Sequence, residues 1–282
     1  MKIIVTGGAG FIGSHLTDRL IESGHAVTVI DSLVTGDRRN INPRAAFREV
    51  DIRDTGLREI FRQEAPDIVF HLAAQINVRA STEDPVFDTA VNVGGSLSVI
   101  QAFLAAPGDS KWFVFASTGG AIYGETDLIP TPETVEPFPL CPYGVSKLAV
   151  ERHLHYFQRF HGLGYTALRF ANVYGPRQNA LAEAGVIAIF AAKMLAGEQP
   201  AIFGDGRQTR DFVYVDDVVD AAIAVMDHRA DGVFNVGTGI ETDVIRIFDL
   251  IRDATGARIA RTHLPERPGE VRRSALAVEK IR

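Results

Sequence analysis

The stretch Lys2–Leu16, KIIVTGGAGFIGSHL, decides the fold that the sequence predicts. It opens with a short, β-branched apolar run, which is typical of a parallel strand buried on both faces. Beyond the glycines, apolar residues recur at helical spacing as far as Gly24, where a glycine favours a helix end. A second apolar run, Ala26–Asp31, predicts another buried strand. The chain as far as Asp31 therefore predicts one β–α–β unit.

The alternation of strand and helix patterns continues through most of the chain. Further strands are predicted at Phe47–Ile52, Asp67–Ala74, Trp112–Thr118, Thr166–Gly175 and Val233–Gly237, and helices at Ala90–Ala106 and Val145–His161. This alternation favours an α/β fold with a doubly wound parallel sheet of the Rossmann type. We expect residues 1–171 to form the sheet domain, with 212–238 folding back onto it. The more irregular residues 172–211 and 239–282 predict a smaller substrate-binding lobe.

Composition and charge argue against several classes of function. With a net charge of −6, the chain lacks the basic balance that is usual in nucleic-acid-binding proteins. Its apolar runs are far shorter than the roughly 18 residues of a membrane span, so no membrane contact is expected. Cys141 is the only cysteine, which favours a reducing, cytoplasmic location. No metal site is expected, because the histidines are poorly spaced for ligating one ion.

The glycines between the first strand and the first helix predict a dinucleotide-binding loop. Gly7, Gly10 and Gly13 lie in this turn, and G-x-G-x-x-G is matched from Gly8. Glycine lets backbone N–H groups approach a pyrophosphate, and the helix N-terminus adds favourable partial charge. Asp31 ends the second strand, where a carboxylate favours NAD over NADP. Arg38 and Arg39 weaken this preference somewhat. Residues 1–171 are thus the predicted NAD-binding domain.

A tyrosine and a lysine in YGVSK predict a proton-transfer pair. Tyr143 and Lys147 are four residues apart on a predicted helix and therefore share one face. A phenol needs its pKa lowered by about 3 units, or about 4 kcal/mol, to act as a base near pH 7. One cation about 4 Å away supplies roughly that energy at an effective dielectric constant of 20. Lys147 together with the positive ring of oxidised NAD could lower the tyrosine pKa by this amount. The alternative interpretation is a tyrosine packed in the core beside a surface lysine that has no role in catalysis.

Taken together, the motifs of the chain resemble those of a known family. They include TGGAGFIGSHL at 6–16, HLAAQ at 71–75, STGGAIYG at 117–124, YGVSK at 143–147, RFANVYGPRQ at 169–178, FGDGRQTRDFVYVDDV at 203–218 and RPGEVRRS at 267–274. The chain resembles the extended short-chain dehydrogenases/reductases. Within them it is similar to the NAD-dependent nucleotide-sugar epimerases and dehydratases, most of all the UDP-glucose 4-epimerases.

The resemblance implies roles for individual residues. Tyr143 would be the catalytic base and acid, Lys147 would hold the nicotinamide ribose, and Ser117 or Thr118 would contact the sugar O4. The coenzyme contacts implied are Gly7, Gly10, Phe11, Ile12, Gly13, Asp31, Asp51, Ile52, Ala73, Tyr143 and Lys147. The contacts implied for a UDP-sugar are Asn172, Lys193, Phe203, Arg210, Arg267, Glu270 and Ser274. Guanidinium groups such as those of Arg210 and Arg267 suit a diphosphate.

The implied reaction is a 4-epimerisation through a transient 4-keto sugar, with NAD retained as a cofactor. A 4,6-dehydratase needs a further acid and base, and dehydratases of this family resemble TDE after the strand where this chain has Thr118-Gly119-Gly120. A UDP-glucuronate decarboxylase or a non-catalytic NAD sensor are the remaining alternatives. A small Ser274 would leave room for N-acetyl sugars. The resemblance also implies a homodimer formed through the helices Ala90–Ala106 and Val145–His161.

Overall fold

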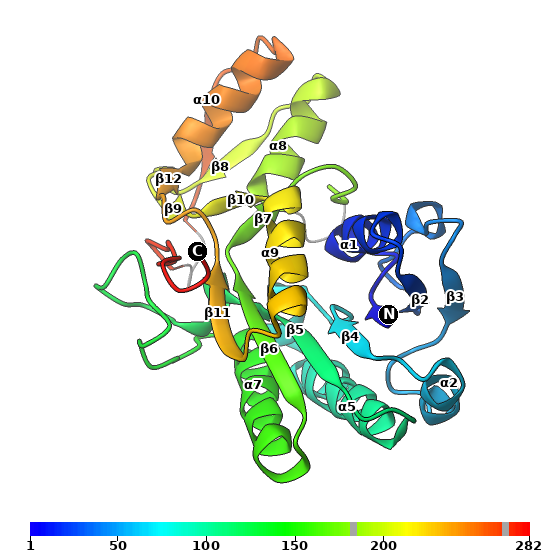
Figure 1. The fold of residues 1–282 in the computed structure, drawn as a ribbon. Helices are drawn as coiled ribbons and strands as arrows, with labels where there is room; N and C mark the ends of the chain where they lie inside the picture. The colour runs from blue at the N-terminus through cyan, green and yellow to red at the C-terminus, as the bar shows by residue number, and fades with distance from the viewer. Residues whose placement is uncertain (181–184, 267–270) are drawn as a thin grey trace.

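The computed structural model describes residues 1–180, 185–266 and 271–282, and a seven-stranded parallel sheet forms its centre (Figure 1). Its strands are β1 (Lys2–Thr6), β2 (Ala26–Asp31), β3 (Ala46–Glu49), β4 (Ile68–His71), β5 (Trp112–Thr118), β6 (Gly164–Phe170) and β11 (Gly232–Val236). The spatial order is β11-β6-β5-β4-β1-β2-β3. The order reverses between β1 and β4, which is the switch point where open α/β sheets bind ligands. The predicted doubly wound sheet is confirmed.

Helices cover both faces of this sheet. They are α1 (Phe11–Glu22) and α9 (Val215–His228) on one face, and α2 (Leu57–Glu64), α5 (Ser96–Ala105) and α7 (Pro142–His161) on the other. In β1, Ile3 and Val5 pack in the core cluster of α1 and α9, whereas Ile4 packs in that of α2 and α5. Burying such a side chain contributes about 1.5–3 kcal/mol. The apolar run that begins the chain is therefore buried on both faces, as predicted.

Short helices lie around the carboxyl edge of the sheet. They are η1 (Arg38–Asn40), α3 (Val78–Glu83), α4 (Pro85–Thr89), the π-helix η2 (Ala90–Gly95) and α6 (Gly119–Ile122). The helix predicted at Ala90–Ala106 is thus a π-helical segment followed by α5. Within the described ranges, no helix is both long and apolar enough to cross a bilayer.

In its described residues, the lobe contains two helices and three two-stranded sheets. These elements are α8 (Val186–Leu195), α10 (Val244–Thr255), and the strand pairs β7–β10 (Asn172–Tyr174 and Phe212–Tyr214), β8–β13 (Ala201–Phe203 and Thr262–Leu264) and β9–β12 (Thr209–Arg210 and Thr242–Asp243). Phe190, Ile202 and Phe248 belong to a separate apolar cluster in this lobe. Figure 1 shows α8 and α10 beyond the carboxyl edge of the main sheet.

One predicted strand was wrong in its extent. The run Thr166–Gly175 is divided at Ala171 into β6 and β7, which belong to different sheets. The Ala171 N–H donates to Val236 in the main sheet, whereas the next N–H, of Asn172, donates to Asp211. The chain therefore changes its hydrogen-bonding partner within one residue. Because β7 has left the main sheet, its partner β10 lies outside the main sheet as well. The elements that follow β10, helix α9 and strand β11, do return to the main sheet.

Candidate active site

A cavity of about 420 Å³ opens at the carboxyl edge of the sheet, at the switch point between β1 and β4. Every residue predicted to contact the coenzyme lines it: Gly7, Gly10, Phe11, Ile12, Gly13, Asp31, Asp51, Ile52, Ala73, Tyr143 and Lys147. Ser117 lines it as well, together with Ser32, Thr35, Gln75, Asn77, Arg53, Phe87 and Phe170, which the sequence analysis did not single out. Four of these further residues, Ser32, Thr35, Gln75 and Asn77, lie in the loops that follow β2 and β4. Their position after parallel strands was the signal that could have identified them.

The glycine loop can pack this tightly against its own backbone only because Gly7 and Gly13 have no side chains. Gly7 has a φ of 74°, and a Cβ on it would lie 2.7 Å from the backbone nitrogen of Ala73. A Cβ on Gly13 would lie 2.2 Å from the carbonyl oxygen of Gly7. The N-cap of α1 is Gly10, so no side chain caps the first N–H groups of this helix. The residues that bear these groups line the cavity, and such N–H groups suit the pyrophosphate of NAD.

Asp31, which is predicted to contact the ribose of NAD, also forms hydrogen bonds within the protein. Its Oδ2 accepts from the Ala9 N–H at 2.9 Å, and its Oδ1 accepts from the Leu33 N–H at 2.9 Å. The carboxylate thus fixes the glycine loop to the end of β2. Each carboxylate oxygen has a second lone pair, so the ribose contact predicted for Asp31 stays possible on chemical grounds.

The arginines near the adenosine end of the cavity are paired with carboxylates. Arg38 pairs with Glu49, Arg39 with Asp37, and Arg53 with Asp51. These exposed ion pairs contribute little to stability, but they neutralise the cations that could receive a 2′-phosphate. Arg38 and Arg39 therefore disfavour NAD less than the sequence alone implied.

Tyr143 and Lys147 lie together at the cavity, with the Lys147 Nζ 5.7 Å from the centre of the tyrosine ring. Lys147 is only 4% exposed, and its Nζ donates to the Ala116 carbonyl at 2.8 Å. Burial lowers the pKa of Lys147 to about 8, so its ammonium form still dominates at pH 7. Burial also raises the pKa of Tyr143, and Cys141 and Asp88 act in the same direction. In the chain without its coenzyme, the Tyr143 pKa therefore lies above its ordinary value. The prediction that Tyr143 acts as a base thus depends on the positive ring of oxidised NAD as well as on Lys147.

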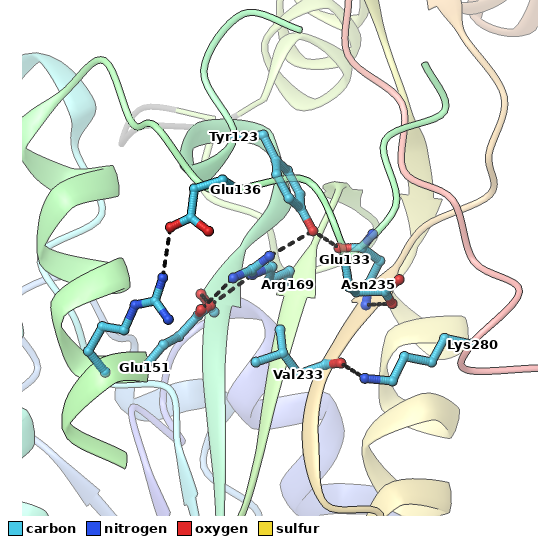
Figure 2. Close-up of polar contacts among 10 residues, drawn as sticks. Tyr123, Glu133, Glu136, Glu151, Arg169, Val233, Asn235 and Lys280 are labelled. Carbon is cyan, nitrogen blue, oxygen red and sulfur yellow. Dashed lines mark hydrogen bonds and ion pairs between the residues drawn. The ribbon is translucent and has the colours of Figure 1, made fainter. Parts of the chain in front are cut away.

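The two hydroxyl groups at the end of β5 have different surroundings. The buried Ser117 hydroxyl donates to Glu151 Oε1 at 2.5 Å, and Glu151 in turn forms an ion pair with Arg169 (Figure 2). The Thr118 side chain is half-buried and makes no hydrogen bond within the described part of the chain. Ser117 lines the cavity and Thr118 does not, but among the described residues only the Thr118 hydroxyl of the two has no hydrogen-bond partner.

Five of the residues predicted to bind the nucleotide sugar are described by the structure; they lie in or next to the lobe, and none of these five lines the cavity. Asn172 is on β7, Lys193 on α8, Phe203 on β8, Arg210 on β9 and Ser274 near the C-terminus, and all are half-buried. Arg267 and Glu270 lie outside the described residues. The Thr209 N–H donates to the Arg272 carbonyl at 3.0 Å. The segments carrying Asn172, Arg210 and Ser274 are therefore neighbours, since β7 also bonds to Asp211.

Asp88 is a buried polar residue beside the site that the sequence analysis missed. It is 0% exposed and accepts a hydrogen bond from Ser146, the residue before Lys147. The sequence around Asp88 looks the same as that around an exposed carboxylate in the first turn of a helix. Its burial follows from the packing of α4 against α7, which is a tertiary property.

Comparison with known proteins places this geometry in a family. The sequence model of the NAD dependent epimerase/dehydratase family matches residues 3–237. A putative UDP-glucose 4-epimerase of Methanocaldococcus jannaschii is 46% identical over 99% of this chain and 90% of its own length.

Two solved structures resemble the fold closely. The Thermotoga maritima UDP-glucose 4-epimerase with UDP-glucose has a TM-score of 0.96 and 47% identity, covering 99% of this chain and 91% of that one. The Thermus thermophilus UDP-glucose 4-epimerase in complex with NAD has a TM-score of 0.95 and 41% identity, covering 100% and 92%. With the glycine loop, the Tyr143–Lys147 pair and this similarity together, the chain belongs to the NAD dependent epimerase/dehydratase family.

Proposed function

We propose that the chain is a UDP-hexose 4-epimerase that interconverts UDP-glucose and UDP-galactose with NAD as a retained cofactor. The observation that carries this proposal is one cavity on which the glycine loop, Tyr143 and Lys147 all open. The cavity lies at the switch point of the sheet, beside a lobe that bears the predicted nucleotide contacts. Similarity to UDP-glucose 4-epimerases over nearly the whole chain supports the same reaction.

The residues of the chain have separate tasks in this reaction. NAD, when bound, accepts and returns the hydride of the sugar C4. Tyr143 takes the proton from the O4 hydroxyl and later gives it back. The ammonium group of Lys147 holds the ribose and favours the phenolate. Because burial opposes that phenolate, the site needs a further positive charge, which the oxidised nicotinamide ring carries.

The region of the sugar lies after β5. Thr118 is proposed to position the O4 hydroxyl, since Ser117 already donates to Glu151. The residues that follow, Gly119 and Gly120, bring no carboxylate, so the acid and base that a 4,6-dehydratase needs are not supplied here. On the nucleotide side, Asn172, Arg210 and Ser274 are proposed contacts, as their segments are neighbours. The same role is proposed for Lys193, Phe203, Arg267 and Glu270 from the family resemblance.

One experiment separates this function from its alternatives. Purified protein is incubated without added NAD with UDP-galactose, UDP-glucuronate and the N-acetyl sugars, and products are followed by proton NMR and mass spectrometry. An epimerase changes the sugar spectrum without a change in mass, whereas a decarboxylase loses CO₂ and a dehydratase loses water. Tyr143→Phe is expected to lower turnover by about 10²–10⁴-fold while NAD content is kept. Bound NAD with no turnover of any sugar would favour the sensor.

The acceptance of N-acetyl sugars is a finer proposal about Ser274. This side chain is small and half-buried, and it lies two residues from Arg272, which is bonded to β9. We expect Ser274→Tyr to reduce kcat/KM for UDP-N-acetylglucosamine more than for UDP-glucose, because the phenol would occupy the space of the acetyl group. Equal losses for the two sugars would contradict the proposal.

A homodimer and a cytoplasmic location complete the proposal. Val145, Tyr156 and Phe160 lie on one face of α7 and are exposed, Phe160 by 71%. An exposed apolar stripe on a long helix suits a second copy of the chain. Light scattering should give twice the mass of the chain, and Phe160→Arg should halve it.

A further inference from the structure

Asp88 is a buried carboxylate to which, among the residues that the structure describes, only neutral groups donate hydrogen bonds. It lies on α4 and is 0% exposed. Its Oδ2 accepts from the Ser146 hydroxyl at 2.7 Å, and its Oδ1 accepts from the side-chain amides of Gln75 at 2.9 Å and Asn92 at 3.0 Å. Among the described residues, no lysine, arginine or histidine nitrogen lies within the 4.0 Å of an ion pair.

Such an arrangement brings no cation to the carboxylate. Buried carboxylates are costly unless they are hydrogen-bonded and paired with a cation. Three neutral donors offset part of that cost, but they do not cancel the charge. The negative charge of Asp88 therefore acts on the groups around it through a medium of low dielectric constant.

The three donors belong to the two walls of the active site. Ser146 precedes Lys147 on α7, and Gln75 lines the cavity. Asn92 also holds the Gln75 backbone, since its Oδ1 accepts from the Gln75 N–H at 2.8 Å and its Nδ2 donates to the Gln75 carbonyl at 2.9 Å. Asp88 thus joins the helix of the catalytic pair to the loop that follows β4.

We propose that Asp88 is an electrostatic positioning residue, whose buried charge keeps Lys147 in its ammonium form and whose hydrogen bonds fix α7 against the cavity wall. The role in catalysis rests on the proposed function. The effect on Lys147 is a property of the protein and can be measured without any substrate.

The other titratable groups around Lys147 do not replace Asp88. Glu151 also favours the ammonium form, but Arg169 forms an ion pair with it at 2.6 Å. Burial and the charge of Lys147 lower the pKa of His71 to about 3, so His71 is neutral. Cys141 and Tyr143, whose pKa values burial raises, are neutral as well. Asp88 is therefore the unpaired charge that opposes the burial of Lys147.

The experiment is a pH titration of the Lys147 Nζ by NMR in ¹⁵N-lysine-labelled protein. The chain has five lysines, and Lys147→Met assigns the signal. Asp88→Asn removes the charge but can keep all three hydrogen bonds, since the Ser146 hydroxyl can accept where it donated. We expect the pKa of Lys147 to fall from about 8 by about one unit in this variant.

Ser146→Ala is the matched control, because it removes one hydrogen bond and keeps the charge. Its Lys147 titration should stay near that of the wild type. An unchanged titration in Asp88→Asn, or an equal shift in Ser146→Ala, would overturn the proposal. Should Asp88→Asn fail to fold, Asp88→Ser removes the same charge and is expected to give the same shift.

Activity provides a second, separate readout. Without the charge of Asp88, the pKa values of Lys147 and Tyr143 both fall, so both limbs of the pH profile of kcat should move to lower pH. A loss of activity at all pH values without this displacement would contradict the electrostatic role. Absence of epimerase activity in the wild type would refute the proposed function, while the NMR titration would still decide the role of Asp88.

Discussion

Two buried carboxylates with opposite surroundings lie at helix α7: Glu151 belongs to the helix, and Asp88 of α4 accepts a hydrogen bond from its Ser146. Glu151 accepts two hydrogen bonds from Arg169, at 3.0 and 2.6 Å, and one from Ser117. Arg169 also donates to the Tyr123 hydroxyl at 2.8 Å, which continues to Asn235 (Figure 2). Asp88 has only neutral donors.

The two carboxylates therefore have different tasks: the pair of Glu151 and Arg169 holds α7 in place, whereas Asp88 also acts on the titratable groups of α7. The pair of Glu151 and Arg169 joins α7 to β5 and β6, and Asn235 extends the network to β11. Its opposite charges largely cancel at a distance, so it holds the helix without strong effect on the cavity. Asp88 bonds Ser146 in the N-terminal part of α7 and has no cation beside it among the described residues, and its carboxylate acts on Lys147 and Tyr143. Four predictions test this contrast.

The largest effect is expected from breaking the ion pair. Glu151→Gln leaves the 4% exposed Arg169 without its anion, which should lower the free energy of unfolding by about 3–5 kcal/mol. Urea unfolding at pH 7 measures this change. Replacing both residues by methionine should cost less than the single substitution. A loss below about 1 kcal/mol in Glu151→Gln would mean that the pair does not hold α7.

The second-largest effect is the loss of stability at low pH that we expect from His71, a buried histidine that is neutral in the folded protein. Its ring nitrogens lie 2.7 Å from the Thr6 hydroxyl and 2.8 Å from the Ser96 hydroxyl. Burial lowers its pKa to about 3 from 6.5, so the unfolded chain binds the proton first as pH falls below 6.5. Stability is therefore lost as pH falls, by about 2–3 kcal/mol at pH 4.5.

The measurement for His71 is the free energy of unfolding at pH 7 and pH 4.5 in the wild type and in His71→Gln. The variant lacks the titrating ring, so its loss between the two pH values should be smaller by that amount. Equal losses in both proteins would show that His71 is protonated in the folded state at pH 4.5.

The hydroxyl groups of β5 give the third prediction. Thr118→Val should lower kcat by about tenfold or more, equivalent to about 1.4 kcal/mol of barrier, because the proposed O4 contact is lost. Ser117→Ala should change kcat less than threefold and lower stability by about 1 kcal/mol through Glu151. Steady-state kinetics with UDP-galactose and urea unfolding decide it. A larger kinetic effect at Ser117 would reverse the assignment.

The smallest effect is expected from Asp88→Asn on stability. Asparagine can keep the bonds to Gln75, Asn92 and Ser146, and a buried charge is removed. The free energy of unfolding at pH 7 should stay within about 1 kcal/mol of the wild type. A loss as large as that of Glu151→Gln would show that Asp88 has the same purely structural role.

Much of the fold could be predicted because its signals are local. The buried strands Ala26–Asp31 and Trp112–Thr118 have the bounds that their apolar runs predict. Most residues predicted to contact the coenzyme lie near strand ends or in the glycine loop, which the topology brings to one cavity. The exchange of sheets at Ala171 and the burial of Asp88 could not be predicted, since each depends on segments far away in the sequence.

The segment Ala275–Val278 has a consequence for the order in which the protein matures. Leu276 packs in the core beside the main sheet, and its N–H donates to Asp211. Ala275 and Ala277 exchange backbone hydrogen bonds with Thr131, in the connection that leads to α7. These residues are synthesised long after Thr131, which they bond across more than 140 positions of the chain. The space that Leu276 fills beside the main sheet therefore closes only after this segment has been synthesised.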